Sequence, residues 1–454
     1  MTRLWAEQAL LADGWARNVA VTLQGDRIAR IEAGAAPAPG DHRLGALLPA
    51  PANLHSHAFQ RAMAGMTERR GPTASDSFWT WRQLMFRFLD QLTPDDVEAI
   101  AAFVQMEMLE AGYGASVEFH YLHHAPGGTA YANPAEMAAR ITAGAARSGI
   151  GLTLLPVLYM QGGCDGRALG PGQVRFGNDI ESFARIVGGA EAALRALPAD
   201  ATLGIAPHSL RAVTPAALAA AAALRPGAPL HMHLAEQVAE VEEVTAAQGA
   251  RPVEWLLANA EVDARWCLIH CTQMLHAETL ALAATGAVAG LCPITESSLG
   301  DGIFDGVAWM RAAGRFGIGS DSNIRIGLTE ELRVLEHSQR LRDRGRAMLA
   351  TEAQSTGRVL FEGAARGGAQ AAGRESGAIA EGLLADLVAL DTGGVDLDGR
   401  QGDALLDAWI FAGDDRAVAD VWSAGRHLVN GGRHHDRDAI VAAYRAVLRR
   451  LRAA

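Results

Sequence analysis

The chain has 454 residues, 49% hydrophobic and 20% charged, which is typical of a globular protein with a large core. Its net charge of −11 and its scattered basic residues argue against a nucleic acid or a membrane surface as partner. No apolar run approaches the roughly 18 residues of a membrane span, and the N-terminus lacks the apolar segment of a signal peptide. The scattered cysteines favour neither a disulfide framework nor a cysteine zinc site, so we expect a cytoplasmic protein. They are Cys164, Cys267, Cys271 and Cys292.

The chain contains no lysine, because all 40 of its Lys and Arg positions are arginine. This composition excludes chemistry that needs a lysine amine. Schiff bases, pyridoxal-phosphate attachment and P-loop nucleotide hydrolysis are therefore ruled out. A metal pair bridged by a carbamylated lysine is ruled out as well.

The chain begins with a β-rich segment and continues with alternating strands and helices. Residues 1–44 predict short strands with turn signals at Asp13-Gly14 and Gly25-Asp26. From residue 45, eight apolar or β-branched runs alternate with helical patterns, such as 93–112 with Thr93 as its N-cap. The runs span 45–55, 115–122, 150–160, 202–209, 229–236, 265–273, 286–294 and 314–323.

Near-continuous apolar strands that alternate with helices predict a parallel sheet covered on both faces. Eight such units within residues 45–376 favour an α/β fold of the (β/α)8 TIM-barrel type, with a doubly wound open sheet as the weaker alternative. Residues 377–434 again predict short strands separated by turns, like residues 1–44. We therefore expect residues 1–44 and 377–434 to form a small β-sandwich domain beside the barrel. An arginine-rich amphipathic helix is expected over residues 435–454.

Polar residues follow the predicted barrel strands. The first run ends in His55 and His57, and residues i and i+2 of a strand point the same way, so both imidazoles can face one point. Barrel active sites lie at the carboxyl ends of the strands, and neutral imidazole suits zinc, so we predict a metal centre at this rim. The other rim residues are Glu118, His120, Tyr121, His208, Arg211, His231, His233, Glu236, His270 and Asp321.

Several of these residues have a second interpretation. Glu118 and His120 are equally well explained as satisfied polar groups under a loop. His231 could be a metal ligand, although the spacing to Glu236 favours His233.

The order of these residues resembles the amidohydrolase superfamily. A histidine pair follows the first strand, single histidines follow the fifth and sixth strands, and an aspartate follows the eighth. His233 and Glu236 in HLAE resemble the deaminase branch of that superfamily. Longer motifs resemble the formimidoylglutamate deiminase family, although Asn323 stands where that family is expected to have histidine. These motifs are NLHSHAFQRAMAG (53–65), DSFWTWR (76–82), EFHYLHH (118–124), PHSLRAV (207–213), RWCLIH (265–270), LGDGIF (299–304) and GIGSDS (317–322).

The resemblance implies one zinc ion per chain, since a second ion would need the absent lysine. Its implied ligands are His55, His57, His233 and Asp321. Zinc lowers the pKa of a bound water towards roughly 7. We expect His270 and Asp321 to orient this water and accept its proton, and Glu236 to pass a proton to the departing nitrogen.

The resemblance also implies a small dicarboxylate substrate, N-formimidoyl-L-glutamate, which is hydrolysed to N-formyl-L-glutamate and ammonia in histidine degradation. Its implied binding residues are Gln60, Arg82, Tyr121, His208 and Arg211. The alternatives are a related deaminase for another formimidoyl, guanidino or aromatic amine substrate, and a catalytically dead barrel that acts as a binding module. Barrels of this kind often pair as homodimers.

Overall fold

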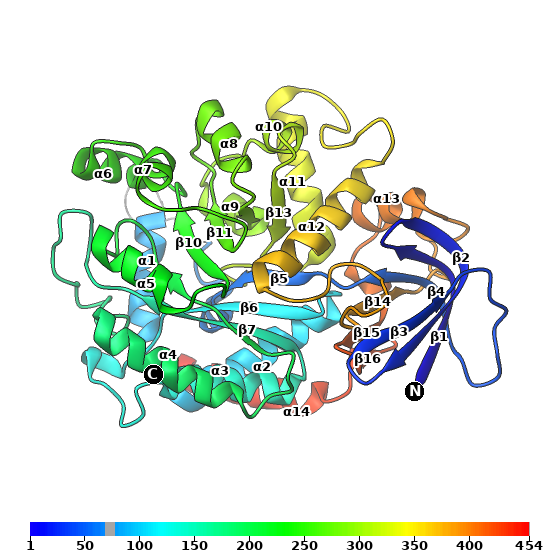
Figure 1. Ribbon diagram of the computed structural model, residues 1–454. Coiled ribbons are helices and arrows are strands. Elements are labelled where there is room, and N and C mark those ends of the chain that lie inside the picture. The colour runs from blue at the N-terminus through cyan, green and yellow to red at the C-terminus, as the bar shows by residue number, and fades with distance from the viewer. Residues whose placement is uncertain (69–77, 454) are drawn as a thin grey trace.

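The computed structural model describes residues 1–68 and 78–453, so the first two residues of the DSFWTWR motif lie outside it. Among the described residues, short parallel strands occupy eight positions around a central ring (Figure 1). The strands are β5 (Ala52–Ser56), β6 (Ala115–His120), β7 (Gly151–Leu158), β8 (Thr202–Leu203) with β9 (Ala206–Pro207), β10 (Leu230–Leu234), β11 (Trp266–His270), β12 (Val288–Leu291) and β13 (Arg315–Ile318).

The ring closes at two junctions. Strands β5 to β8, with β9, pair in parallel on one side, and β10 to β13 pair in parallel on the other. Parallel bridges from Ile205 to Leu230 and from Ser56 to Asp321 join the two halves. The predicted barrel is therefore confirmed, and the open-sheet alternative is wrong.

Helices alternate with the strands and pack outside the ring (Figure 1). Those of the barrel are α2 (Pro94–Glu110), α3 (Glu136–Ser148), α4 (Ile180–Leu194), α5 (Pro215–Leu224), α6 (Val238–Gln248), α7 (Pro252–Asn259), α8 (His276–Ala283), α9 (Pro293–Leu299), α10 (Gly306–Arg311), α11 (Leu328–Asp343) and α12 (Thr356–Ala372). The remaining helical segments are η1 (Ala58–Met63), α1 (Phe78–Leu89), η2 (Pro126–Gly128), α13 (Asp403–Phe411), η3 (Asp415–Ala417) and α14 (Arg437–Ala453). In the described part of the chain, no helix has the length and apolar character needed to cross a bilayer.

Helix α2 begins where the sequence predicts. The Thr93 side chain accepts a hydrogen bond from the Asp96 backbone N–H, and the Asp96 carboxylate accepts one from the Thr93 backbone N–H. This reciprocal capping box satisfies two N–H groups that the helix itself cannot bond. At the other end of the chain, α14 packs on α2 through the stacked rings of Phe103 and Tyr444, 3.9 Å apart.

Both chain ends contribute to a separate β domain, as the sequence predicts. Its strands follow the order β17-β16-β15-β14-β4-β1-β2-β3 and surround a small core that includes Leu4, Val19, Leu44 and Trp422. They are β1 (Thr2–Leu11), β2 (Gly14–Gln24), β3 (Arg27–Glu32), β4 (His42–Pro49), β14 (Leu387–Leu390), β15 (Val418–Ser423), β16 (Arg426–Asn430) and β17 (Arg433–His434).

The predicted first barrel strand, residues 45–55, is two strands. Its first half is β4, which pairs with β1 and β14 of the small domain, and its second half is β5 of the barrel. Pro51 lies between them and has no N–H to donate to a strand partner. The boundary expected at residue 44 thus falls inside β4, and we propose that the barrel domain begins after Pro49. The predicted strand 202–209 is likewise split into β8 and β9.

Candidate functional site

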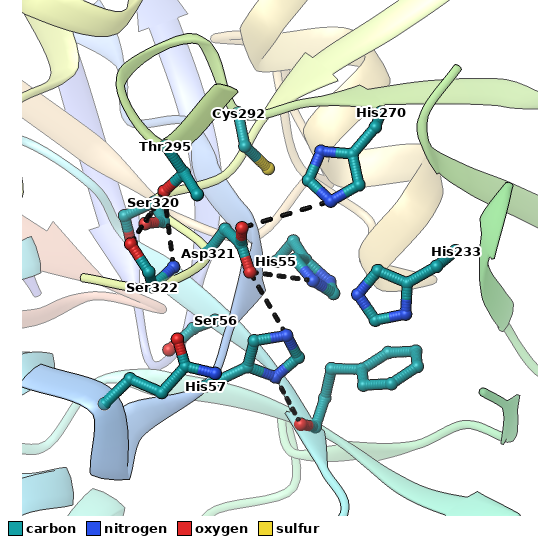
Figure 2. A network of polar contacts seen from close by, with 12 residues as sticks. His55, Ser56, His57, His233, His270, Cys292, Thr295, Ser320, Asp321 and Ser322 are labelled. Atoms are coloured by element: carbon teal, nitrogen blue, oxygen red, sulfur yellow. Dashed lines mark hydrogen bonds and ion pairs between the residues drawn. The ribbon is translucent and has the colours of Figure 1, made fainter. Parts of the chain in front are cut away.

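Four predicted metal ligands converge at the carboxyl ends of the barrel strands (Figure 2). His55 lies in β5 with His57 just after it, His233 lies in β10, and Asp321 follows β13. One donor atom from each residue lies within 4.8 Å of the donors of the other three, and all four residues are buried. The structure therefore brings together the complete set that the sequence indicates.

Hydrogen bonds from the back of two imidazoles fix which nitrogen faces the centre. Nδ1 of His57 lies 3.0 Å from the Phe119 carbonyl oxygen, and Nδ1 of His233 lies 3.1 Å from the His208 carbonyl oxygen. A carbonyl can only accept, so each Nδ1 carries a proton and Nε2 is the nitrogen directed at the centre of the cluster. The His57 Nε2 is 3.1 Å from Oδ1 of Asp321, so the two atoms can act as ligands of one metal ion.

The ionisation of the cluster also suits a divalent metal. Burial lowers the pKa of His55 to about 3 and lowers the pKa of His233 well below its ordinary value. Burial alone would raise the pKa of Asp321, but the adjacent imidazoles of His55 and His57 hold it well below the ordinary value. Neither ring nitrogen of His55 has a hydrogen-bond partner among the described residues. Neutral nitrogens with one carboxylate are a donor set that fits zinc.

The backbone of β5 holds Asp321 in place. The Asp321 N–H donates to the His55 carbonyl and the Asp321 carbonyl accepts from the His57 N–H, both at 2.9 Å. Asp321 has φ 44, a left-handed conformation that costs energy in a residue other than glycine. The Thr295 hydroxyl supports the same loop, since it lies 3.0 Å from the Ser322 hydroxyl (Figure 2).

Asn323 is buried behind the ligand cluster. Its side chain accepts a hydrogen bond from the Ser320 hydroxyl at 2.6 Å and donates one to the Ser56 hydroxyl at 3.1 Å. Asn53 in turn donates to the Ser320 hydroxyl. Asn323 is not among the described residues that line the cavity, and its hydrogen bonds lie with residues behind the ligand cluster.

His270 lies between carboxylates. Its Nδ1 is 3.2 Å from Glu296 Oε1, and its Nε2 is 3.8 Å from Glu236 Oε1 and 3.9 Å from Asp321 Oδ2. Burial lowers the pKa of His270, but the neighbouring Glu236 and Glu296 outweigh it and raise the pKa to about 10. Burial raises the pKa of Glu236. These groups can therefore hold and exchange protons beside the metal ligands.

An open cavity lies beside the metal cluster and the proton-carrying groups, and concave sites of this kind bind small molecules. The sequence-predicted substrate residues Gln60, Arg82, Tyr121, His208 and Arg211 all line it. The other parts of its wall include Trp81, Met85, Tyr159, Phe176 and Leu299.

Two arginines lie in the wall of this cavity. Arg82 donates a hydrogen bond from Nη2 to the Tyr159 hydroxyl at 2.7 Å. Burial alone would lower the pKa of Arg211, but the nearby Glu240 and Glu236 raise it, so Arg211 stays charged. Guanidinium groups at two places in one cavity favour a ligand with more than one anionic group.

Two functional residues are absent from the sequence-based predictions. Tyr159 follows β7 and lines the cavity, and Glu296 follows β12 and binds His270. Tyr159 lies at the end of the predicted run 150–160, and Glu296 follows the run 286–294. Because barrel active sites lie at the carboxyl ends of the strands, a search of the end of every predicted strand would have found both residues.

Two of the ambiguous residues have structural partners. Glu118 accepts a hydrogen bond from the Ala58 backbone N–H at 2.7 Å, directly behind the His57 loop. His231 Nε2 lies 2.7 Å from the Ala371 carbonyl oxygen, so this ring faces α12 and not the ligand cluster.

Comparisons with known proteins agree with this geometry. Residues 46–428 match the model of the amidohydrolase family, and residues 1–45 match the model described as formimidoylglutamate deiminase HutF, N-terminal domain. The chain is 48% identical over 451 residues to the formimidoylglutamate deiminase of Pseudomonas aeruginosa, with 99% of each chain covered. It is 27% identical to the 8-oxoguanine deaminase of the same organism, with 88% of this chain and 86% of the relative covered.

Solved structures show the same fold. An amidohydrolase from Brucella melitensis superposes with a TM-score of 0.96 at 50% identity, covering 99% of this chain and 100% of that one. An adenosine deaminase from Xanthomonas campestris superposes with a TM-score of 0.82 at 22% identity, covering 100% of this chain and 99% of that one. This chain therefore belongs to the amidohydrolase family and, within it, to the formimidoylglutamate deiminases.

Proposed function

We propose that this protein is a zinc-dependent hydrolase that converts N-formimidoyl-L-glutamate and water into N-formyl-L-glutamate and ammonia. The observation that carries the proposal is one buried His-His-His-Asp donor cluster that opens into a cavity with two arginines. The relative at 48% identity, named formimidoylglutamate deiminase, supports the substrate. We place the reaction in the cytoplasm as a step of histidine degradation, and the four free cysteines fit a reducing compartment.

The proposed metal centre takes a single zinc ion. His55, His57, His233 and Asp321 would hold it, and when bound it lowers the pKa of a coordinated water towards about 7. The lysine that could bridge two ions is absent from the sequence. His270 has its Nδ1 bonded to Glu296 and its Nε2 turned towards Glu236 and Asp321, which suits proton transfer.

Proton transfers in this proposal use Asp321, His270 and Glu236. The protonated Nε2 of His270 orients the attacking water, and the Asp321 carboxylate takes the water proton as the bond to the formimidoyl carbon forms. Glu236 then delivers a proton to the departing nitrogen, which leaves as ammonia when its bond to carbon breaks. The 3.8 Å between Glu236 Oε1 and His270 Nε2 lets the two groups exchange a proton with little movement.

The cavity would bind the two carboxylates of the substrate through Arg82 and Arg211. Arg82 is held against the Tyr159 hydroxyl, so its planar fork is oriented before substrate binds. Gln60, Tyr121 and His208 supply the remaining hydrogen bonds from the same wall. The Gln60 amide donates to the Tyr121 hydroxyl at 2.7 Å, which positions both groups.

An ammonia-release assay tests the proposed function. Purified protein loaded with zinc would be given N-formimidoyl-L-glutamate and, separately, guanidino acids, aromatic amines and a neutral formimidoyl amine. We expect N-formimidoyl-L-glutamate to have the highest kcat/KM. A higher value for a guanidino or aromatic substrate would assign the site to a different deaminase, and no ammonia from any substrate would indicate a binding module.

Substrate recognition by the arginines gives one prediction. Arg82→Met or Arg211→Met should each lower kcat/KM for N-formimidoyl-L-glutamate by about 30-fold, roughly 2 kcal/mol, because a carboxylate loses its charged partner. N-formimidoyl-L-aspartate should be a poorer substrate, since it cannot reach both arginines. The matched control is Arg87→Met, at an exposed position of the same helix α1. Wild-type kcat/KM in either cavity variant would show that these arginines do not bind the substrate.

Close packing behind the metal centre gives another prediction. A Cβ at Gly319 would lie 2.7 Å from the Cβ of His55, so Gly319→Ala must push β13 and β5 apart. Displacing His55 from Asp321 should weaken zinc binding by about 10-fold or more, which competition with a chromogenic chelator would measure.

Gly188→Ala is the matched control for this variant. Gly188 lies in α4, and a Cβ there would meet no heavy atom within 4 Å among the described residues. If Gly319→Ala binds zinc as tightly as wild type and Gly188→Ala, the proposed ligand geometry is wrong.

A further inference from the structure

A second cluster of metal-binding side chains lies in the small β domain, away from the barrel rim. It consists of His42 in β4, Asp420 in β15 and His427 in β16, and we refer to it as the small-domain cluster. One donor atom of each residue lies within 4.8 Å of the other two. These residues play no part in the proposed reaction.

The small-domain cluster has the local geometry of the catalytic ligands. His42 Nε2 is 3.4 Å and His427 Nε2 is 2.7 Å from the same oxygen, Oδ1 of Asp420. In the barrel, the Nε2 atoms of His55 and His57 lie 3.4 Å and 3.1 Å from Oδ1 of Asp321. Two imidazoles directed at one carboxylate oxygen thus occur twice in this chain.

Packing holds the two imidazoles of the small-domain cluster in place. The Trp422 ring stacks on His427 with centroids 4.5 Å apart and an interplanar angle of 13°, and it meets His42 edge-on at 5.6 Å. The pairing of β15 with β16 shifts between Val421 and Trp422, so that Leu428 forms a bulge beside His427. A bulge re-aims the neighbouring side chain, and here the ring points towards Asp420.

The small-domain cluster is open to solvent. The side chains of His42 and His427 are 37% and 30% exposed, whereas that of Asp420 is 11% exposed. A hydrated ion can therefore reach all three donors, and water can fill its remaining coordination positions. Imidazole nitrogens with one carboxylate suit late first-row divalent ions, and they do not suit Ca²⁺ or Mg²⁺.

We propose that His42, Asp420 and His427 bind one divalent transition-metal ion, such as Zn²⁺, at a site separate from the catalytic centre. The ion would connect the first residue of β4 to the β15–β16 hairpin, two segments that lie far apart in the sequence. The bound ion would therefore act on the small domain, and the reaction in the barrel would not require this ion.

Equilibrium dialysis of the full chain against micromolar zinc, followed by metal analysis, tests this site. Wild type should bind one more zinc ion per chain than the double variant His42→Gln/His427→Gln, and both should have the same kcat. His276→Gln is the matched control, because this exposed histidine also lies near a carboxylate, 4.0 Å from Asp305. Equal zinc content in wild type and the double variant, or an equal loss in His276→Gln, would overturn the proposal.

A second measurement uses only the wild-type chain, so it does not depend on the folding of a variant. Zinc should protect His42 and His427 from modification by diethyl pyrocarbonate, as quantified by peptide mass spectrometry. The exposed His276 should react equally with and without zinc. Unchanged modification of His42 and His427 at saturating zinc would show that the small-domain cluster binds no metal.

Discussion

Glu236→Gln is expected to lower kcat by about 10³-fold and to leave bound zinc unchanged. The carboxamide keeps the size of the side chain but cannot deliver a proton to the departing nitrogen, and general acid catalysis contributes about 10² to 10⁴-fold. Glu236 is buried, and burial raises its pKa, which favours the protonated carboxyl group that this step needs. Steady-state kinetics together with metal analysis of the same sample would measure both quantities.

A control variant and a second active-site variant test whether the loss of turnover is specific to the proposed proton carriers. Glu242→Gln, at an exposed position of α6, should retain wild-type kcat. His270→Asn should also lose turnover and keep zinc, because His270 lies outside the four-ligand cluster. Zinc loss in Glu236→Gln or His270→Asn would show that these residues belong to the metal centre and that the division of roles is wrong.

The fold could be predicted because barrel strands are short, buried and apolar. Each of the eight predicted runs overlaps a barrel strand, and Thr93 caps α2 as expected. The division of residues 45–55 between β4 and β5 was not predicted, since nearly all residues of both halves are buried. Hydrophobic periodicity cannot show which sheet a buried strand joins, because partners distant in the sequence decide it.

The candidate site was predictable where a residue follows a strand of the barrel. His55, His57, His233 and Asp321 are positioned by strand geometry, so sequence spacing alone brings them to one rim. The orientation of Asn323 depends on hydrogen bonds to residues that lie close only in the folded chain, and spacing carries no information on those bonds.

Removal of zinc is expected to abolish ammonia release. The proposed ligands are three imidazoles and one carboxylate, and among the described residues no proton-carrying side chain replaces the water activation that the ion supplies. Protein treated with a strong chelator and dialysed should therefore be folded but inactive. Circular dichroism would confirm the fold, and untreated protein taken through the same dialysis is the control.

The number of zinc ions required for activity tests the single-metal account most directly. The His42→Gln/His427→Gln protein would be stripped of metal and titrated with zinc, so that the small-domain cluster does not compete. Ammonia release from N-formimidoyl-L-glutamate should rise linearly and reach its full value at about one equivalent per chain. Full activity reached only at about two equivalents, or activity in the stripped protein, would contradict the single-metal mechanism.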